Sequence, residues 1–267
     1  MAEVLRPFNC MLAGAASIIG LLLGGSSEPE LAAVAFLSVF AITGAGNAIN
    51  DYYDRLIDAV NRPARPIPSG RISPGSAFAC SLLLFLAGCL MAYALGPICA
   101  SLAALNSLML IVYARNLKSM PLLGNLSVAY LTGSTFLFGG AAAGGILQNV
   151  IPFLLSSLAT LSREIVKDIE DIKGDRLGGA RTLPILTGER FSSALAAAFA
   201  LAAVALSPIP PLGAAYTAAI LLADLLLLYS VYRIARGDAA GSQRMLKSGM
   251  ALALLAFLAG ALEGIGL

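Results

Sequence analysis

Two acidic segments of the sequence repeat one spacing, D-x-x-D-x-x-x-D. Positions i, i+3 and i+7 of an α-helix point the same way within about 60°, so each segment predicts a stripe of carboxylates along one helix. The first cluster consists of Asp51, Asp54 and Asp58, and the second cluster consists of Asp168, Asp171 and Asp175. Asn47 and Asn50 extend the first stripe upstream by one turn, whereas Gly174 could end the second helix before Asp175.

The chemistry that such clusters suit is the binding of a cation. Carboxylates held side by side repel one another, and each is costly near lipid, so a bound cation would stabilise them. The chain contains no His, and oxygen ligands without His or Cys suit Mg²⁺. Protein-bound Mg²⁺ takes one or two carboxylates and keeps positions for phosphate oxygens. Two clusters therefore predict a site that binds a diphosphate through metal bridges.

Each acidic segment runs into a basic turn, ARPIPSG after the first and ARTLPILTG after the second. The segments lie 117 residues apart, from Asp51 to Asp168, which indicates an internal duplication. One charged segment alone would equally suit a solvated loop, but the repeated spacing favours a shared function. The arginines near these turns either bind phosphate oxygens or set topology and contact lipid headgroups, and both interpretations stay open. They are Arg62, Arg65, Arg71 and Arg181.

The rest of the chain is strongly apolar. Of its 267 residues, 58% are hydrophobic and 12% are charged, and the mean hydropathy is +0.85. Soluble domains are about 25% charged, so the composition predicts a polytopic membrane protein. A membrane helix needs about 20 apolar residues, and breaks with Gly and Pro divide the chain into nine such stretches. The predicted spans are 8–25, 31–50, 75–95, 97–114, 122–144, 147–166, 192–208, 212–234 and 247–265.

The 17 Lys and Arg residues predict the orientation. If the chain has nine spans, all 17 basic residues fall on one side of the membrane. They lie before the first span, at the end of the sixth span, or in the connections that follow the second, fourth, sixth and eighth spans. The opposite connections, such as SSEPE and SPIPPLG, contain none. The positive-inside rule then places the N-terminus and the charged connections in the cytoplasm and the C-terminus outside.

Other polar residues lie within the apolar stretches. The four Cys have no CxxC spacing, so neither a zinc site nor a disulfide framework is expected. Asp224 lies in the middle of span 212–234, where an ionisable group indicates a functional site or a carboxyl bonded to a neighbouring helix. The second interpretation is favoured, because Asp224 belongs to neither cluster. The run GGAAAGG (139–145) indicates close helix packing or a cavity wall.

Several segments resemble motifs of the UbiA superfamily of intramembrane prenyltransferases. NDYYDRLIDAVNRPARPIPSG is similar to the first Asp-rich motif of that superfamily, and KDIEDIKGDRLGGARTLPI is similar to the second. LRPFNCMLAG resembles its first helix, and YARNLKSMPLLGNLSVAYLTG resembles its fourth-to-fifth connection. The resemblance covers nearly the whole chain. It implies a single all-α membrane domain over 1–267, with nine transmembrane helices in a U-shaped bundle around a central cavity and two pseudo-repeats whose motifs lie at 47–58 and 168–175.

The resemblance also implies roles for individual residues. The implied Mg²⁺ ligands are Asn50, Asp51, Asp54, Asp58, Asp168, Asp171 and Asp175, of which Asp54, Asp58, Asp171 and Asp175 are the implied catalytic carboxylates. The implied contacts to diphosphate or substrate are Arg6, Asn9, Asn47, Lys118 and Lys167, and Arg62, Arg65 and Arg181 are further candidates. The aromatic residues that could flank an allylic cation are Tyr52, Tyr113, Tyr130 and Phe136, although packing is the simpler role for each.

Within the superfamily, the chain is most similar to archaeal members that make ether lipids. The implied reaction is Mg²⁺-dependent transfer of a geranylgeranyl group from geranylgeranyl diphosphate to the hydroxyl of geranylgeranylglyceryl phosphate, on the cytoplasmic side of the cell membrane. The implied partners are these lipids and the bilayer, and no nucleic acid. An aromatic acceptor such as 4-hydroxybenzoate, or haem, is an alternative. A cation-coupled transporter is less favoured, because transporter acids lie near the bilayer midplane and here only Asp224 does.

Overall fold

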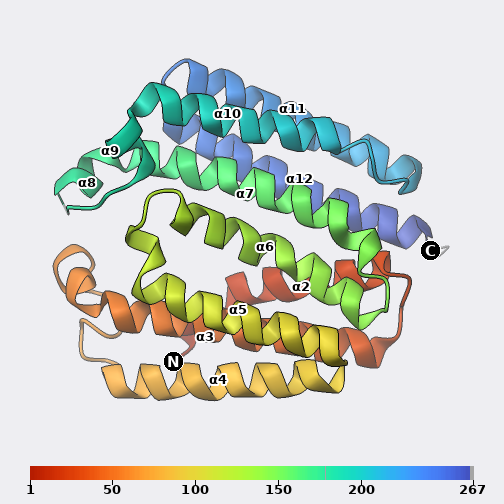
Figure 1. The fold of residues 1–267 in the computed structure, drawn as a ribbon, viewed down its shortest axis with the longest axis horizontal. Helices are drawn as coiled ribbons and strands as arrows, with labels where there is room; N and C mark the ends of the chain where they lie inside the picture. Colours follow the sequence, from red (N-terminus) through yellow and green to blue (C-terminus); the bar gives the residue numbers. More distant parts are fainter. Residues whose placement is uncertain (178, 265–267) are drawn as a thin grey trace. The chain divides into compact units, whose positions relative to one another are not determined.

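The computed structural model describes residues 1–177 and 179–264, and this part of the chain forms helices and turns without any strand (Figure 1). Two compact units form. The N-terminal unit comprises Met1–Leu117 and Thr135–Leu147, and the C-terminal unit comprises Lys118–Ser134 and Gln148–Leu267. The helices are α1 (Ala2–Leu5), α2 (Pro7–Leu23), α3 (Pro29–Asn61), α4 (Pro74–Ala94), α5 (Pro97–Arg115), η1 (Leu117–Ser119), α6 (Leu123–Ala142), η2 (Leu147–Asn149), α7 (Val150–Glu170), α8 (Ile172–Leu177), α9 (Leu183–Thr187), α10 (Glu189–Leu206), α11 (Gly213–Ala235) and α12 (Ala239–Gly264).

Proline marks the start of the long helices in the N-terminal unit. Helices α2 to α5 begin at Pro7, Pro29, Pro74 and Pro97. Proline suits the first helical position because the amide hydrogen that it lacks would have no partner inside the helix. In α4 the backbone N–H of Ser76 also donates to Ser73 Oγ at 3.0 Å. The Pro-containing breaks in the sequence therefore correspond to helix starts.

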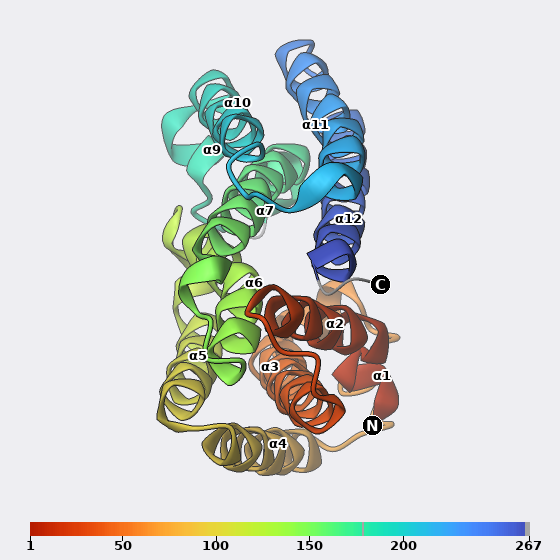
Figure 2. The same cartoon turned by 90° about the vertical axis from the view of Figure 1, so that its right-hand side faces the viewer.

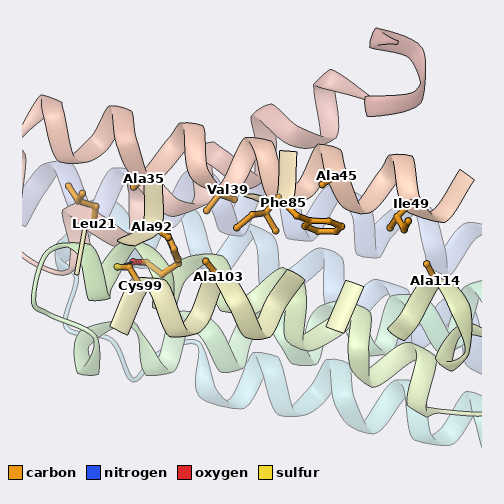
Figure 3. Close-up of a cluster of buried hydrophobic side chains, with 12 residues drawn as sticks. Leu21, Ala35, Val39, Ala45, Ile49, Phe85, Ala92, Cys99, Ala103 and Ala114 are labelled. Atoms are coloured by element: carbon orange, nitrogen blue, oxygen red, sulfur yellow. Dashed lines mark hydrogen bonds between the residues drawn. The ribbon is translucent and has the colours of Figure 1, made fainter. Parts of the chain in front are cut away.

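Helix α3 is the centre of the N-terminal unit, and α2, α4 and α5 pack against it (Figure 2). Figure 3 shows the core that these helices share, with Val39 and Ile49 of α3 buried beside Phe85 of α4 and Ala103 of α5. Leu21 of α2 belongs to the same cluster. This packing fixes the position of α3, which carries the whole first acidic segment.

Helix α2 meets the second half of α6 at glycine residues. A β-carbon on Gly139 would lie 1.9 Å from the carbonyl oxygen of Ser17, and one on Gly20 would lie 2.5 Å from that of Phe136. Neither position therefore has room for a side chain, because the obstacle is backbone. The run GGAAAGG thus serves close helix packing at its first glycine.

In the C-terminal unit, α7 packs against α10 and α12, and α11 forms an antiparallel hairpin with α12 (Figures 1 and 2). Ser207 Oγ, at the end of α10, donates to Asp224 Oδ2 of α11 at 2.6 Å. Tyr216 Oη donates to the Ser207 carbonyl oxygen at 2.7 Å. Asp224 is therefore hydrogen-bonded to the end of a neighbouring helix, in keeping with the packing interpretation.

Six helices are long and apolar enough to cross a membrane, judged by length and composition within the described residues. They are α3, α4, α5, α10, α11 and α12. The other predicted spans, 8–25, 122–144 and 147–166, overlap α2, α6 and α7, which do not reach the same combination of length and apolar composition. These three stay predictions as membrane spans.

Two of the six helices extend more than two turns past the predicted spans. Helix α3 continues from residue 50 to Asn61, and α12 begins at Ala239 instead of residue 247. The early start of α12 has a local cause, since the Gly241 N–H donates to Asp238 Oδ1 at 2.8 Å and Asp is a favoured N-cap residue. Residue 265, the last of the predicted ninth span, lies outside the described residues.

Replacing Gly139 by Ala is expected to destabilise the protein by about 1–3 kcal/mol, the usual cost of overpacking. The added methyl group would push α2 and α6 apart at Ser17. Thermal unfolding in detergent measures the effect. Gly75→Ala is the matched control, because a β-carbon on Gly75 meets nothing within 4 Å. Equal melting temperatures for the two variants would contradict the tight contact.

Candidate active site

The first cluster occupies the last three turns of α3. This helix has 33 residues and is about 50 Å long at about 1.5 Å per residue, whereas the hydrocarbon core of a bilayer is about 30 Å thick. The helix can therefore cross the hydrocarbon and still carry Asp51, Asp54 and Asp58 on a polar extension. The side chains of Asp51 and Asp58 are only 7% and 9% exposed.

Two arginines neutralise these buried carboxylates. Arg6 Nη2 lies 2.6 Å from Asp51 Oδ1. Arg65 Nη1 lies 2.6 Å from Asp58 Oδ2 and 3.4 Å from Asp51 Oδ1. Arg6 and Arg65, which the sequence suggested as substrate contacts, thus bind carboxylates of their own chain in this structure.

The short helix α1 determines where Arg6 lies. Arg6 joins α1 to α2 in the left-handed conformation, with φ 53° and ψ 67°, which costs a residue with a β-carbon roughly 1–2 kcal/mol. Asn47 Nδ2 donates to the Leu5 carbonyl oxygen at 2.9 Å. The Arg71 guanidinium donates two hydrogen bonds, of 2.6 and 3.1 Å, to the carboxylate of Glu3. These contacts fasten α1 to α3 and to the turn after it, and so hold Arg6 in place.

The second cluster spans the end of α7 and the helix α8. Helix α7 ends at Glu170 with Asp171 as its C-cap residue, and α8 carries Asp175. The sequence suggested that this helix ends at Gly174, but in the structure it ends three residues earlier, at Asp171. The Asp175 N–H still donates to the Asp171 carbonyl oxygen at 2.9 Å, so the helical spacing of the two acids is kept across the break.

The carboxylates of the second cluster have no basic partner within ion-pair distance among residues 1–177 and 179–264. Asn125 Nδ2 donates to Asp168 Oδ2 at 2.9 Å. Burial raises the pKa of Asp168 to about 6, and the hydrogen bond from Asn125 opposes that rise. Burial also raises the pKa of Asp175, and repulsion from Asp171 adds to the effect. What distinguishes this cluster from the first is therefore its lack of arginine counter-ions within ion-pair distance in the described part of the chain.

Glu164 lies one turn before Asp168 on α7 and is 8% exposed. Its carboxylate accepts a hydrogen bond from Arg163, and Lys167 Nζ lies 3.9 Å from its Oε2. The nearest basic residues of α7 are therefore paired with Glu164 and not with the second cluster.

The remaining candidates are spread over other elements. Asn50 Nδ2 donates to Asp54 Oδ2 at 2.9 Å. Four side chains are exposed or half-buried, namely Asn9 in the first turn of α2, Arg62 at the end of α3, Lys118 in η1 and Arg181 between α8 and α9. Tyr52 packs against the ring of Phe78 at 5.0 Å between centroids, so it has a packing role in this structure.

The donor set of the clusters fits a divalent cation. Arg65 Nη1 lies within 3.4 Å of oxygens from both Asp51 and Asp58, so two acids two turns apart converge on one cationic atom. Carboxylate oxygens are the ligands that Mg²⁺ prefers. Within the described ranges no three side chains of His, Cys, Asp or Glu are gathered closely enough to enclose a metal ion.

Sequence reasoning missed Glu3, Asn125 and Glu164. Glu164 had a detectable signal, because it follows Asn47 by 117 residues, the same offset that relates the two clusters. Glu3 and Asn125 had no such signal, since their partners are 68 and 43 residues away and only the folded chain brings them together.

Metal binding at the second cluster is expected to depend on pH near 6. Protons compete with metal for a carboxylate, so Mn²⁺ affinity should fall as the pH is lowered through about 6, the pKa of Asp168. Asn125→Leu removes the hydrogen bond that lowers this pKa, so the midpoint should move to higher pH. Mn²⁺ titrations followed by electron paramagnetic resonance measure both midpoints. Asn61→Leu, in the other unit, is the control, and an unmoved midpoint in Asn125→Leu would contradict the assigned role of Asn125.

The chain is similar to known proteins over almost its whole length. Residues 11–259 match the UbiA prenyltransferase family. The chain is 53% identical over 262 residues to the digeranylgeranylglyceryl phosphate synthase of Methanothrix thermoacetophila, covering 97% of this chain and 98% of that protein. It is 47% identical over 279 residues to the enzyme of the same name from Methanosarcina mazei, covering 97% of this chain and 96% of that protein.

Solved structures have the same fold. A structure of a digeranylgeranylglyceryl phosphate synthase has a TM-score of 0.87 at 36% identity and covers 98% of this chain and 97% of its own. A UbiA homologue from Archaeoglobus fulgidus, bound to GPP and Mg²⁺, has a TM-score of 0.71 at 16% identity and covers 97% of each chain, so the two proteins are alike in fold. Together with six apolar helices, these relatives identify a multi-pass membrane prenyltransferase. The chain belongs to the UbiA prenyltransferase family.

Proposed function

We propose that the protein transfers a geranylgeranyl group from geranylgeranyl diphosphate to the hydroxyl of geranylgeranylglyceryl phosphate. The observation that carries the proposal is the likeness, at 53% identity over 97% of the chain, to an enzyme named for the product of that reaction. The carboxylate clusters support the same reaction class, because they suit Mg²⁺ and a diphosphate.

The proposed topology has nine spans in the cell membrane, as one domain in a U-shaped bundle around a central cavity. The N-terminus and the charged connections lie in the cytoplasm, which the one-sided distribution of the 17 Lys and Arg residues supports. The two clusters then both lie at cytoplasmic ends of helices, where the polar head of a prenyl diphosphate enters.

In the proposed site, both clusters serve one diphosphate. The residues that would hold Mg²⁺ are Asn50, Asp51, Asp54 and Asp58 in the first segment and Asp168, Asp171 and Asp175 in the second. Bound Mg²⁺ supplies positive charge that stabilises the departing diphosphate. Arg6, Lys118 and Lys167 would contact phosphate oxygens that the metal leaves free.

The reaction exchanges one bond at C1 of the prenyl chain. The bond from C1 to the diphosphate oxygen breaks, and a bond from C1 to the acceptor hydroxyl oxygen forms. The hydroxyl proton passes to a base, which in a chain without His is a carboxylate, a Tyr or the departing diphosphate. Apolar helices keep water from the allylic cation, which would otherwise be quenched.

The acceptor is tested directly with purified protein, labelled geranylgeranyl diphosphate and Mg²⁺. Labelled digeranylgeranylglyceryl phosphate is expected when geranylgeranylglyceryl phosphate is supplied, and no labelled product is expected from 4-hydroxybenzoate. Chromatography of the extracted lipids measures both. Transfer to the aromatic acid alone would replace this proposal by the alternative of an aromatic acceptor.

Asp54→Ala and Asp171→Ala are each expected to lower turnover by about 100-fold or more, since each removes charge that stabilises the departing group. Both variants should elute from gel filtration as the wild type does. Glu170→Gln is the matched control, because Glu170 is exposed beside Asp171 but lies off the stripe, and it should keep near-normal turnover. Normal turnover in Asp54→Ala or Asp171→Ala would refute the metal assignment.

A further inference from the structure

We propose that Arg6 and Arg65 are resting counter-ions of the first cluster. This cluster then takes up its divalent cation only together with a diphosphate, whereas the second cluster binds a cation alone. The inference rests on the proposed function, because it assumes that the clusters serve metal and diphosphate. Its basis is an electrostatic difference between the two clusters.

The first cluster is neutralised by its own chain. Arg6 and Arg65 make three contacts of 2.6, 2.6 and 3.4 Å with Asp51 and Asp58. Both carboxylates are more than 90% buried, and removing the partner of a buried charge is strongly unfavourable. A divalent cation that entered alone would have to displace these guanidinium groups or lie beside them, and both are unfavourable.

The second cluster has no such counter-ions in the described residues. Arg163 and Lys167 are paired with Glu164, and the hydrogen bond that Asp168 accepts within residues 1–177 and 179–264 comes from the neutral amide of Asn125. Arg181 follows Ala180 as Arg65 follows Ala64 in the repeated basic turn. Arg181 is exposed, whereas its counterpart Arg65 is bound to two carboxylates.

Arg6 is held at the first cluster by the fold. The contacts of α1 with Asn47 and Arg71 fix the backbone on its N-terminal side, and Pro7 starts α2 directly after it. Its guanidinium can therefore change partners by a side-chain rotation, without a movement of helices.

A diphosphate would free the carboxylates of the first cluster, because Arg6 and Arg65 would bind its phosphate oxygens in place of Asp51 and Asp58. Guanidinium groups bind phosphate oxygens in the same forked geometry as carboxylates. Arg6 and Arg65 can therefore turn from Asp51 and Asp58 to the incoming diphosphate. The two carboxylates can then bind the cation, so the arginines are paired with the diphosphate and the carboxylates with the cation.

The experiment counts bound Mn²⁺ on the purified full-length protein by electron paramagnetic resonance, with inorganic pyrophosphate as the probe. One tight site is expected without pyrophosphate and a second in its presence. Asp171→Asn should abolish the first of these, and Asp54→Asn should abolish only the second. This experiment uses no prenyl substrate. The number of bound Mn²⁺ ions can therefore be interpreted even if the protein fails to transfer a geranylgeranyl group in the assay of the proposed function.

Arg65→Gln tests the counter-ion directly. With one positive charge removed beside the first cluster, the second Mn²⁺ should bind without pyrophosphate, with an affinity raised roughly tenfold or more. Arg115→Gln is the charge-matched control, since Arg115 is exposed at the end of α5 in the same unit, and it should keep one site. Arg6→Gln repeats the test if Arg65→Gln does not fold.

Three results would overturn the inference. The first is two tight Mn²⁺ sites on the wild type without pyrophosphate, and the second is none. The third is a pyrophosphate-independent site that is lost in Asp54→Asn and retained in Asp171→Asn.

Discussion

The structure depends on one constraint, which is that buried carboxylates must have a partner. Asp51 and Asp58 are nearly inaccessible to water, and an unpaired charge in such a place is strongly unfavourable. Several parts of the N-terminal unit place arginine side chains beside these two carboxylates. Helix α1, its left-handed junction at Arg6 and the turn that carries Arg65 all bring positive charge to the same two carboxylates.

The general architecture was predictable from the sequence because it depends on local properties. Apolar length, Pro-containing breaks and the spacing of acids are each visible within about twenty residues, and they predicted a polytopic membrane protein with a site for Mg²⁺ and a diphosphate and with helices close to the observed positions. The prenyltransferase activity was implied by the resemblance of several segments to the UbiA superfamily. The predicted membrane spans stopped short of the end of α3 and of the start of α12, because hydropathy detects the apolar part of a helix and not its polar extension. For α3, the spacing of Asp51, Asp54 and Asp58 had predicted the helical extension. Asp238, the cap that explains the start of α12, lies outside any apolar run.

The contacts within the candidate site were less predictable, because they join residues that are distant in sequence. The role of Arg65 was left open between substrate and topology, and its pairing with Asp58 and Asp51 emerges only when the turn after α3 folds back. The internal duplication predicted which positions of the two segments correspond, but it did not predict which residues their side chains bind. Asn47 and Glu164 occupy equivalent places, yet Asn47 donates to the backbone of α1 and Glu164 accepts from Arg163. Two copies of one pattern have thus acquired different electrostatics.

The division of α6 between the two units has a consequence for the synthesis of the protein. Its second half, with residues up to Leu147, belongs to the N-terminal unit, where Gly139 fits against the backbone of α2. The first 117 residues therefore lack part of their own packing when they leave the ribosome. The N-terminal unit reaches its final packing only after more than half of the chain has been made. Helix α2 is therefore synthesised well before the half of α6 that packs against it, because the first cluster, α4 and α5 are translated in between.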